Sequence, residues 1–408
     1  MSTTDLPFLK SKNKTAARAA DFIAFVSDRT TEQVLKSFVL EQAMPHVHIA
    51  VGTVDDAIAY LERIERSPLF LMIDLQDSVM PLSDLGRLAE VCEPSVQVVA
   101  LGERNDVGLF RSLLKLGVRD YLVKPLTVEL LKRTVNVAGG KVSDVVMSRA
   151  GKTIAFVGSR GGVGVTTLAL NVARYLSDET HRRVAYVDLN LHGSAANVML
   201  GLQSNNGLSD VLENQHRLDP QYVDRTLVAK GTRLFMLTAE RPFSAAPAFE
   251  PGSLARVLQV LCDSFHYVII DIPGPSDALA QEAFDHASRC YIVADRSVHS
   301  ARETIKLLRH IEDRDNNPPT SLLLNNPNAA TAGKVQPADF VGAIGRAVLH
   351  EIPFESKAVA VAENLGEKPK DKSQNGFTQS VVRVAADLTG QHTMVERSFL
   401  QKFKLRRG

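Results

Sequence analysis

Short apolar segments rich in β-branched residues recur along the chain, and amphipathic stretches separate them. Within those stretches the apolar residues return every three or four positions, which is typical of helices that cover a core. The alternation predicts an α/β protein with two doubly wound parallel sheets. The expected strands are residues 22–26, 46–51, 69–73, 96–101 and 121–123 in the first sheet, and residues 153–157, 183–187, 234–237, 267–271, 290–294, 321–326 and 348–353 in the second.

Changes in composition predict where the domains begin and end. The first residues are polar and charged, which is typical of a disordered lead-in. The pair Gly139-Gly140 breaks the last helix of the first half, so we expect the connection between domains there. The predicted parts are a lead-in over residues 1–19, an N-terminal domain over 20–138, a linker over 139–151, a second domain over 152–390 and a basic amphipathic tail over 391–408.

The glycine-rich segment 158–167, GSRGGVGVTT, lies between a predicted strand and a predicted helix. This is the context of a phosphate-binding loop, in which glycines let successive N–H groups and the helix N-terminus face an anion. Ser159 replaces the usual first glycine, and Val165 stands where a lysine is expected. Thr166 keeps the hydroxyl that belongs to a Mg²⁺ ligand. The nucleotide-binding candidates are Arg160, Gly161, Gly162, Val163, Gly164, Val165, Thr166 and Thr167.

A second signal is the apolar run that ends at Asp271 and continues into Pro273-Gly274. A buried strand that delivers an aspartate to its carboxyl end is the Walker-B arrangement, in which the carboxylate holds Mg²⁺ through water. Thr166 and Asp271 are therefore the candidate Mg²⁺ residues.

The loop resembles the deviant phosphate-binding loop of the MinD/ParA ATPases, whose fold is a P-loop NTPase. In that family a second lysine stands at the position of Arg160 and reaches the nucleotide across a dimer interface. Arg160 keeps the charge and can clamp a phosphate with two N–H groups. The resemblance implies ATP and Mg²⁺ as cofactors and a homodimer as the assembly.

The same resemblance implies roles for three residues at other strand ends. Asp188 and Asn190 occupy the positions of the family's D-x-D pair, whose second acid helps to set up the attacking water. Asn190 can orient water but cannot accept its proton, so hydrolysis is expected to be weak or absent. Asn325 occupies the place of the asparagine that hydrogen-bonds adenine, and residues 358–366 resemble the closing segment beside the base.

The segment 117–125, GVRDYLVKP, resembles the end of a response-regulator receiver domain, a flavodoxin-like fold. Asp28, Asp74 and Lys124 occupy the positions of the Mg²⁺-binding acid, the phosphoacceptor and the phosphate-contacting lysine. Ser27 replaces one of the usual two acids, and Gly102 stands where a threonine or serine usually responds to phosphorylation. The domain is either a phosphorylatable receiver or a degenerate one kept for docking or dimerisation, and the sequence leaves both open.

Composition narrows the function classes. The formal net charge of the 408 residues is +1, which gives no general attraction to nucleic acid or membrane. The three cysteines lack CxxC spacing, which favours reduced thiols in a cytoplasmic protein. The polar start predicts no signal peptide, and no apolar run is long enough to span a bilayer.

Residues 394–407 form either a segment that lies at a membrane interface or a soluble docking terminus.

A receiver-like domain followed by a MinD/ParA-like domain resembles the CpaE/TadZ pilus-assembly family across about residues 20–390. The resemblance implies a cytoplasmic scaffold, placed at a pole and peripheral to the inner membrane, that positions a Tad/Flp-type pilus secretion machine. ATP would then act mainly as a dimer-stabilising ligand, and the partners would be pilus components rather than nucleic acid. Two alternatives stay open: an active partitioning ATPase, which Val165 and Asn190 disfavour, and an output protein switched by phosphorylation at Asp74, which Gly102 disfavours.

Overall fold

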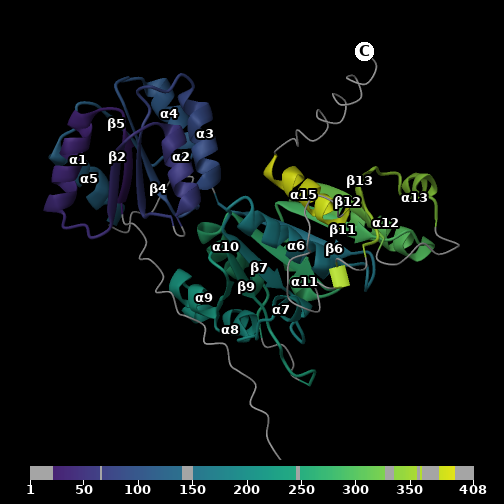
Figure 1. The fold of residues 1–408 in the computed structure, drawn as a ribbon. Helices are drawn as coiled ribbons and strands as arrows, with labels where there is room; N and C mark the ends of the chain where they lie inside the picture. The colour runs from purple at the N-terminus through teal and green to yellow at the C-terminus, as the bar shows by residue number, and fades with distance from the viewer. Residues whose placement is uncertain are drawn as a thin grey trace, which may run out of the picture. The chain divides into compact units, whose positions relative to one another are not determined.

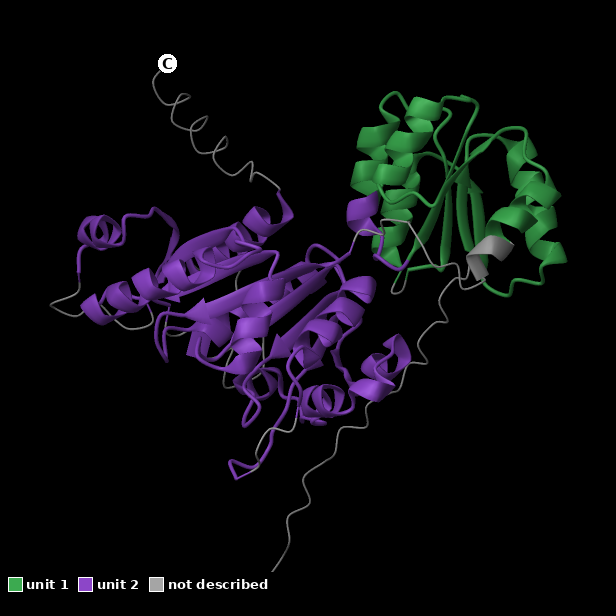
Figure 2. Ribbon diagram, turned by 180° about the vertical axis from the view of Figure 1, so that it is seen from behind, with its two compact units in different colours: residues 1–88, 96–146 green, residues 89–95, 147–408 purple. Residues whose placement is uncertain are grey.

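The computed structural model describes residues 22–64, 67–139, 150–244, 249–326, 335–355, 359–360 and 376–390. The chain divides into two compact units, residues 1–88 with 96–146 and residues 89–95 with 147–408 (Figure 2). The predicted lead-in and tail, and residues 140–149 of the predicted linker, lie outside the described residues. Within the part that the structure describes, no helix is long and apolar enough to cross a membrane.

The N-terminal unit is a five-stranded parallel sheet with the order β2-β1-β3-β4-β5, that of a flavodoxin-like fold (Figure 1). Helices α1 and α5 pack together on one face of the sheet, and α2, α3 and α4 cover the other. The elements are β1 (Phe22–Val26), α1 (Arg29–Glu41), β2 (Val47–Val51), α2 (Val54–Arg63), β3 (Phe70–Asp74), α3 (Pro81–Val91), β4 (Gln97–Gly102), α4 (Val107–Lys115), β5 (Asp120–Val123) and α5 (Val128–Gly139).

The second unit is an eight-stranded sheet with the order β13-β12-β11-β6-β10-β7-β9-β8. All neighbours pair in parallel except β8, a short edge strand antiparallel to β9. Its strands are β6 (Lys152–Gly158), β7 (Val184–Asp188), β8 (Val228–Lys230), β9 (Leu234–Leu237), β10 (Tyr267–Ile272), β11 (Arg289–Ala294), β12 (Thr320–Asn325) and β13 (Val348–Ile352).

Helices cover both faces of this sheet, which is why its central strands are mostly apolar. Helices α6 and α15 pack together on one face, and the larger core on the other face includes residues of α8, α10, α11 and α12. The helices are α6 (Val165–Asp178), α7 (Ala195–Leu200), α8 (Gly207–Glu213), the 3₁₀ turn η1 (Gln215–Arg217), α9 (Pro220–Thr226), α10 (Ser253–Ser264), α11 (Ala278–His286), α12 (Val298–Glu312), α13 (Pro337–Ile344) and α15 (Gly376–Thr389).

The predicted fold class, two parallel α/β sheets, is confirmed, but the pattern of apolar residues misses several short elements. It predicts no helix between β3 and β4, where α3 lies, because Pro81 and Gly86 are residues typical of loops. Helices α7 and α8 have six and seven residues, which is too short for a helical period to be read. The antiparallel strand β8 has three residues and was likewise not predicted.

Candidate functional site

The turn between β6 and α6 is built on glycine backbone that other residues could not adopt. Gly162 and Gly164 have φ values of +75° and +90°, in the left-handed region. A Cβ at Gly164 would lie 2.6 Å from Nδ2 of Asn325, and one at Gly158 would lie 2.8 Å from the carbonyl oxygen of Arg160. Val163 is fully buried and anchors the turn in the core. The backbone is therefore fixed at the N-terminus of α6, where an anion is stabilised.

The side chains of this loop carry little free charge. Val165, at the position expected for a lysine, is partly buried and packs against the apolar core, and its Cγ2 also lies 2.9 Å from where a Cβ at Gly158 would be. Arg160 forms an ion pair with Asp295, and its Nη1 also donates to the Gly161 carbonyl oxygen at 3.0 Å. Nucleotide binding at this loop would therefore rest on backbone N–H groups, on Arg160 and on a cation.

A pair of buried carboxylates lies beside the loop. Asp271 is the penultimate residue of β10 and the register partner of Asp188 at the end of β7, and the two residues are 2% and 3% exposed. Burial and the charge of Asp271 raise the pKa of Asp188 to about 7. Burial also raises the pKa of Asp271, although hydrogen bonds from Thr166 and Tyr186 act in the opposite direction. Two acids brought together in the interior favour a cation between or beside them.

The residues present fit Mg²⁺ held jointly with a nucleotide. Mg²⁺ is usually bound by one or two carboxylates together with phosphate oxygens and water. In the described residues, no group of three or more His, Cys, Asp or Glu could hold a metal by itself. The Thr166 hydroxyl and the Asp271 carboxylate, which the structure brings together, supply hard oxygen ligands of the expected kind. Their assignment to Mg²⁺ stays a prediction.

Sequence reasoning missed Tyr186, which is fully buried on β7. Its hydroxyl donates to Oδ2 of Asp271 at 2.9 Å, so it occupies one acceptor site of this carboxylate. A tyrosine in the middle of a buried strand was the available signal, because a buried phenol usually has a hydrogen-bond partner.

The two asparagines at strand ends are engaged locally. Asn190 donates from Nδ2 to the Gly193 carbonyl oxygen at 2.8 Å, and its Oδ1 accepts from the His192 N–H at 3.2 Å. Asn325 is 8% exposed and donates from Nδ2 to the carbonyl oxygen of Val163 at 2.7 Å, so it braces the glycine loop. The predicted roles of Asn190 toward water and of Asn325 toward adenine stay predictions.

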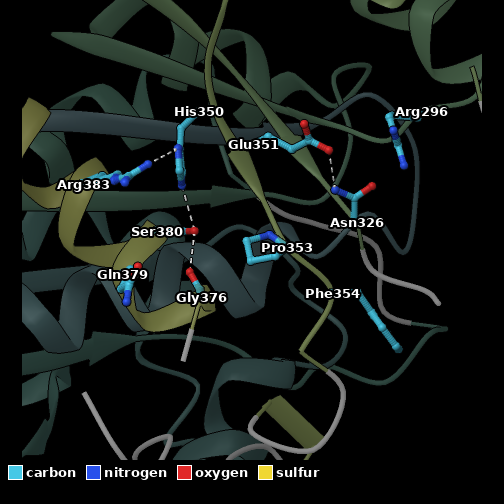
Figure 3. Close-up of a pocket in the computed structure, with 10 residues that line it drawn as sticks. All are labelled: Arg296, Asn326, His350, Glu351, Pro353, Phe354, Gly376, Gln379, Ser380 and Arg383. Atoms are coloured by element: carbon cyan, nitrogen blue, oxygen red, sulfur yellow. Dashed lines mark hydrogen bonds between the residues drawn. The ribbon is translucent and has the colours of Figure 1, made fainter. Parts of the chain in front are cut away.

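A cavity of about 500 Å³ opens at the carboxyl ends of β12 and β13, where it is lined by Asn326, the residue after Asn325 (Figure 3). A row of hydrogen bonds runs along one side, from Arg383 to His350, Ser380 and the Gly376 carbonyl oxygen. Burial and the charge of Arg383 lower the pKa of His350. Its other lining residues are Arg296, Asn326, Glu351, Pro353, Phe354 and Gln379. Of the predicted closing segment 358–366, only residues 359–360 are described.

In the N-terminal unit the three predicted site residues meet at the carboxyl edge of the sheet. Lys124 forms ion pairs with Asp28, at 2.7 Å, and with Asp74. Burial opposes ionisation of Asp28, but hydrogen bonds from Lys124 and Thr31 outweigh it and lower the pKa of this carboxyl. Thr31 is involved because Asp28 is also the N-cap of α1.

Asp74 is enclosed by its neighbours. Its side chain has no exposed surface, and its Oδ2 accepts from both the backbone N–H and the hydroxyl of Ser27, at 3.0 and 2.7 Å. Gln76 also bonds to the cluster: its Oε1 accepts from Lys124 at 2.8 Å, and its backbone N–H donates to Oδ1 of Asp74 at 3.0 Å. The carboxylate therefore has its charge and its hydrogen bonds satisfied from within the unit.

Gly102 is required by packing at the same edge. A Cβ at this position would lie 2.4 Å from the hydroxyl oxygen of Tyr121, which is 9% exposed. The tyrosine ring therefore fills the space that a threonine or serine side chain would need.

Comparison with known proteins concerns mainly the second unit. Residues 151–322 match the family model described as the AAA domain. The septum site-determining protein MinD of Bacillus subtilis is 26% identical over 178 residues, which are 43% of this chain and 65% of that protein. The chain spans 52–65% of the length of the curated relatives that it matches.

Solved structures extend the likeness to the fold. A ParA family ATPase from Chlorobium tepidum is 21% identical, with a TM-score of 0.53 over 58% of this chain and 98% of that chain. MinD from Pyrococcus horikoshii, solved with Mg-ADP, is 20% identical, with a TM-score of 0.51 over 58% of this chain and 95% of that chain.

A pilus assembly protein CpaE from Caulobacter crescentus is 28% identical, with a TM-score of 0.27 over 29% of this chain and 97% of that chain. The AAA domain match includes the glycine loop and both buried carboxylates, and the two ATPase structures share the fold over 58% of this chain. The second unit is therefore similar to the MinD/ParA-like ATPases in sequence and has the fold of a P-loop NTPase of their type.

Proposed function

We propose that the protein is an ATP-binding scaffold in which the nucleotide acts mainly as a structural ligand that stabilises a homodimer. The observation that carries the proposal is the state of the glycine loop: its backbone is formed, but Val165 supplies an apolar side chain where a lysine is expected, and Asn190 replaces the second acid. A loop of this kind can bind phosphates, yet it lacks the lysine and the carboxylate expected of efficient hydrolysis.

In this proposal the N–H groups of the loop and the N-terminus of α6 bind the phosphates. Thr166 and Asp271 hold Mg²⁺, which supplies positive charge toward the phosphates when it is bound. Tyr186 and the neighbouring strand fix the position of the Asp271 carboxylate. The base and ribose would lie toward Asn325 and the adjoining cavity. Because only the folded, dimeric state binds ATP in this way, ATP stabilises that state by mass action.

The first test is a paired measurement of ATP·Mg²⁺ affinity by calorimetry and of steady-state phosphate release. We expect binding with phosphate release far below about 1 s⁻¹, a typical enzyme rate. Asp271→Asn should lose binding, whereas Asp339→Asn, which changes an exposed carboxylate on α13, should not. Turnover near or above that rate would refute the scaffold proposal and support an active partitioning ATPase. If the wild type does not bind ATP, a nucleotide role is refuted.

For the N-terminal unit we propose docking or dimerisation rather than a phosphorylation switch. The supporting observation is the enclosed Asp74 side chain, whose oxygens are already used by Ser27 and Lys124. Incubation with acetyl phosphate and Mg²⁺, followed by mass spectrometry of the intact protein, should show no phosphorylated species. A species heavier by one phosphoryl group, lost in Asp74→Asn, would establish the switch instead.

We further propose that this scaffold is cytoplasmic, sits at a pole beside the inner membrane and positions a Tad/Flp-type pilus secretion machine. The support is the order of the two units and the form of the glycine loop. In a host strain that lacks the gene, the wild-type protein should restore pili and Asp271→Asn should not. Deletion of residues 391–408 should reduce co-sedimentation with anionic vesicles if the tail contacts the membrane. Restoration of pili by Asp271→Asn would contradict a nucleotide-dependent role in pilus assembly.

A further inference from the structure

Arg160 is the only ionisable side chain in residues 158–167, and it is already neutralised within the chain. Its Nη2 forms an ion pair with Oδ2 of Asp295, just beyond β11, and its Nη1 donates to the Gly161 carbonyl oxygen. The Arg160 side chain is 34% exposed, and that of Asp295 is 13% exposed. The pair is thus partly shielded from solvent and salt, where an ion pair is stronger than on an open surface.

Asp295 is held rigidly in the position that meets Arg160. Its Oδ1 accepts from the hydroxyl of Ser297 at 2.7 Å, and its backbone N–H donates to Oγ of Ser300 at 2.9 Å. Ser300 is fully buried, and its hydroxyl lies 2.6 Å from that of Ser159 at the start of the glycine loop. The turn after β11 is therefore tied directly to the loop that would bind phosphate.

Because of the charges around the loop, the Arg160–Asp295 ion pair affects the binding of any anion there. Val165 supplies no charge, and the nearby Asp188 and Asp271 carboxylates are buried acids. With Arg160 matched by Asp295, the loop offers a phosphate no unmatched side-chain cation. A phosphate that engages Arg160 must compete with the Asp295 carboxylate or share the guanidinium with it.

We propose that Asp295 is a positioning residue that holds Arg160 in the nucleotide-free state and competes with the nucleotide phosphates for it. Binding of the triphosphate releases Arg160 from Asp295, so Asp295 lowers nucleotide affinity and keeps the free protein from presenting an exposed cation. This inference rests on the proposed nucleotide binding and adds a residue outside the glycine loop that tunes it.

The test compares ATP·Mg²⁺ affinity by calorimetry in the full-length wild type, Asp295→Asn, Arg160→Gln and the double variant. Asp295→Asn should bind about tenfold more tightly, because the phosphate no longer competes with a carboxylate for the guanidinium. The double variant should bind like Arg160→Gln alone, since the effect of Asp295 passes through Arg160. Glu303→Gln, which removes the same charge from α12 where Glu303 pairs with Lys306, should leave affinity unchanged.

Ser297→Ala provides a second variant that keeps the charge of Asp295 and removes the hydroxyl that fixes it. It should strengthen ATP binding by a smaller factor, about twofold to threefold, because Asp295 would hold Arg160 less firmly. Unchanged or weaker binding by Asp295→Asn would overturn the proposal, as would an equal gain from Asp295→Asn in the Arg160→Gln background. If no form binds ATP, the proposed function fails; if the wild type binds and Asp295→Asn is no tighter, only the role of Asp295 fails.

Discussion

Replacement of Tyr186 by phenylalanine tests whether a hydroxyl group stabilises the buried Asp271 carboxylate. Tyr186 is fully buried, Asp271 is 2% exposed, and the hydroxyl donates to Oδ2 at 2.9 Å. The substitution removes one oxygen atom and leaves the ring, so it creates almost no cavity. Water cannot readily replace the lost donor, because the carboxylate lies inside the sheet.

The expected cost follows from the kind of bond that is lost. Hydrogen bonds to charged groups contribute about 1.5–3 kcal/mol, and an unsatisfied buried partner incurs its full desolvation penalty. We therefore expect Tyr186→Phe to reduce the free energy of unfolding by about 2 kcal/mol, which in a unit of this size lowers the midpoint of thermal unfolding by about 4–8 °C. The measurement is calorimetric unfolding of the full-length protein without nucleotide and with EDTA.

Tyr291→Phe is the matched control. Tyr291 is also fully buried, on β11, and its hydroxyl donates at 2.6 Å to Asp387, whose side chain is 25% exposed and also pairs with Arg289. Water can hydrate Asp387 after the loss, so the cost should be about 1 kcal/mol or less. A cost of Tyr186→Phe equal to or smaller than that of the control would refute the view that burial of Asp271 makes its donor important.

The remaining predictions concern both units. Gly102→Ala should lower the free energy of unfolding of the N-terminal unit by about 1–3 kcal/mol, because the new Cβ meets the Tyr121 hydroxyl. The same substitution in a Tyr121→Phe background should cost less, as measured by calorimetric unfolding. The lowered pKa of Asp28 means that its bonds to Lys124 stabilise the unit above about pH 4, its unfolded value, and are lost as the pH falls below it. Unfolding midpoints of the wild type should therefore fall more steeply between pH 5 and pH 2 than those of Asp28→Asn, and equal slopes would contradict this. Chelation of Mg²⁺ should weaken ATP binding at least about tenfold by calorimetry, because Val165 supplies no compensating charge, and unchanged affinity in EDTA would refute the predicted cation site.

Local signals in the sequence were sufficient for the elements that carry the site. The strands β6 and β10 are almost continuous apolar runs, because a parallel sheet covered on both faces buries residues 153–157 of β6 and every residue of β10. The glycine loop was recognisable because Gly162 and Gly164 need backbone conformations that other residues avoid. The acid at Asp271 was identified from its place at the end of such a strand. These features depend on neighbours within a few positions along the chain.

Contacts between distant segments could not be predicted in the same way. Asn325 was expected at the base of a nucleotide, and the structure also shows it bound to the carbonyl oxygen of Val163, 162 positions earlier. The enclosure of Asp74 by Ser27 and Lys124 depends on β1, β3 and β5 ending at one edge of the sheet. The pattern of residues indicates which face of the sheet a side chain occupies, but the order of the strands determines which residues it contacts there.

The sequence by itself thus determined the two α/β units, the glycine loop and the missing lysine, because each depends on residues that are adjacent or regularly spaced along the chain. Only the tertiary structure decided that Tyr186 donates to Asp271, 85 positions away, and that Arg160 pairs with Asp295, 135 positions away. The physical reason is the order of the strands: β7 and β11 flank the β10-β6 pair, so the charges of the site are balanced by residues brought in from the neighbouring strands.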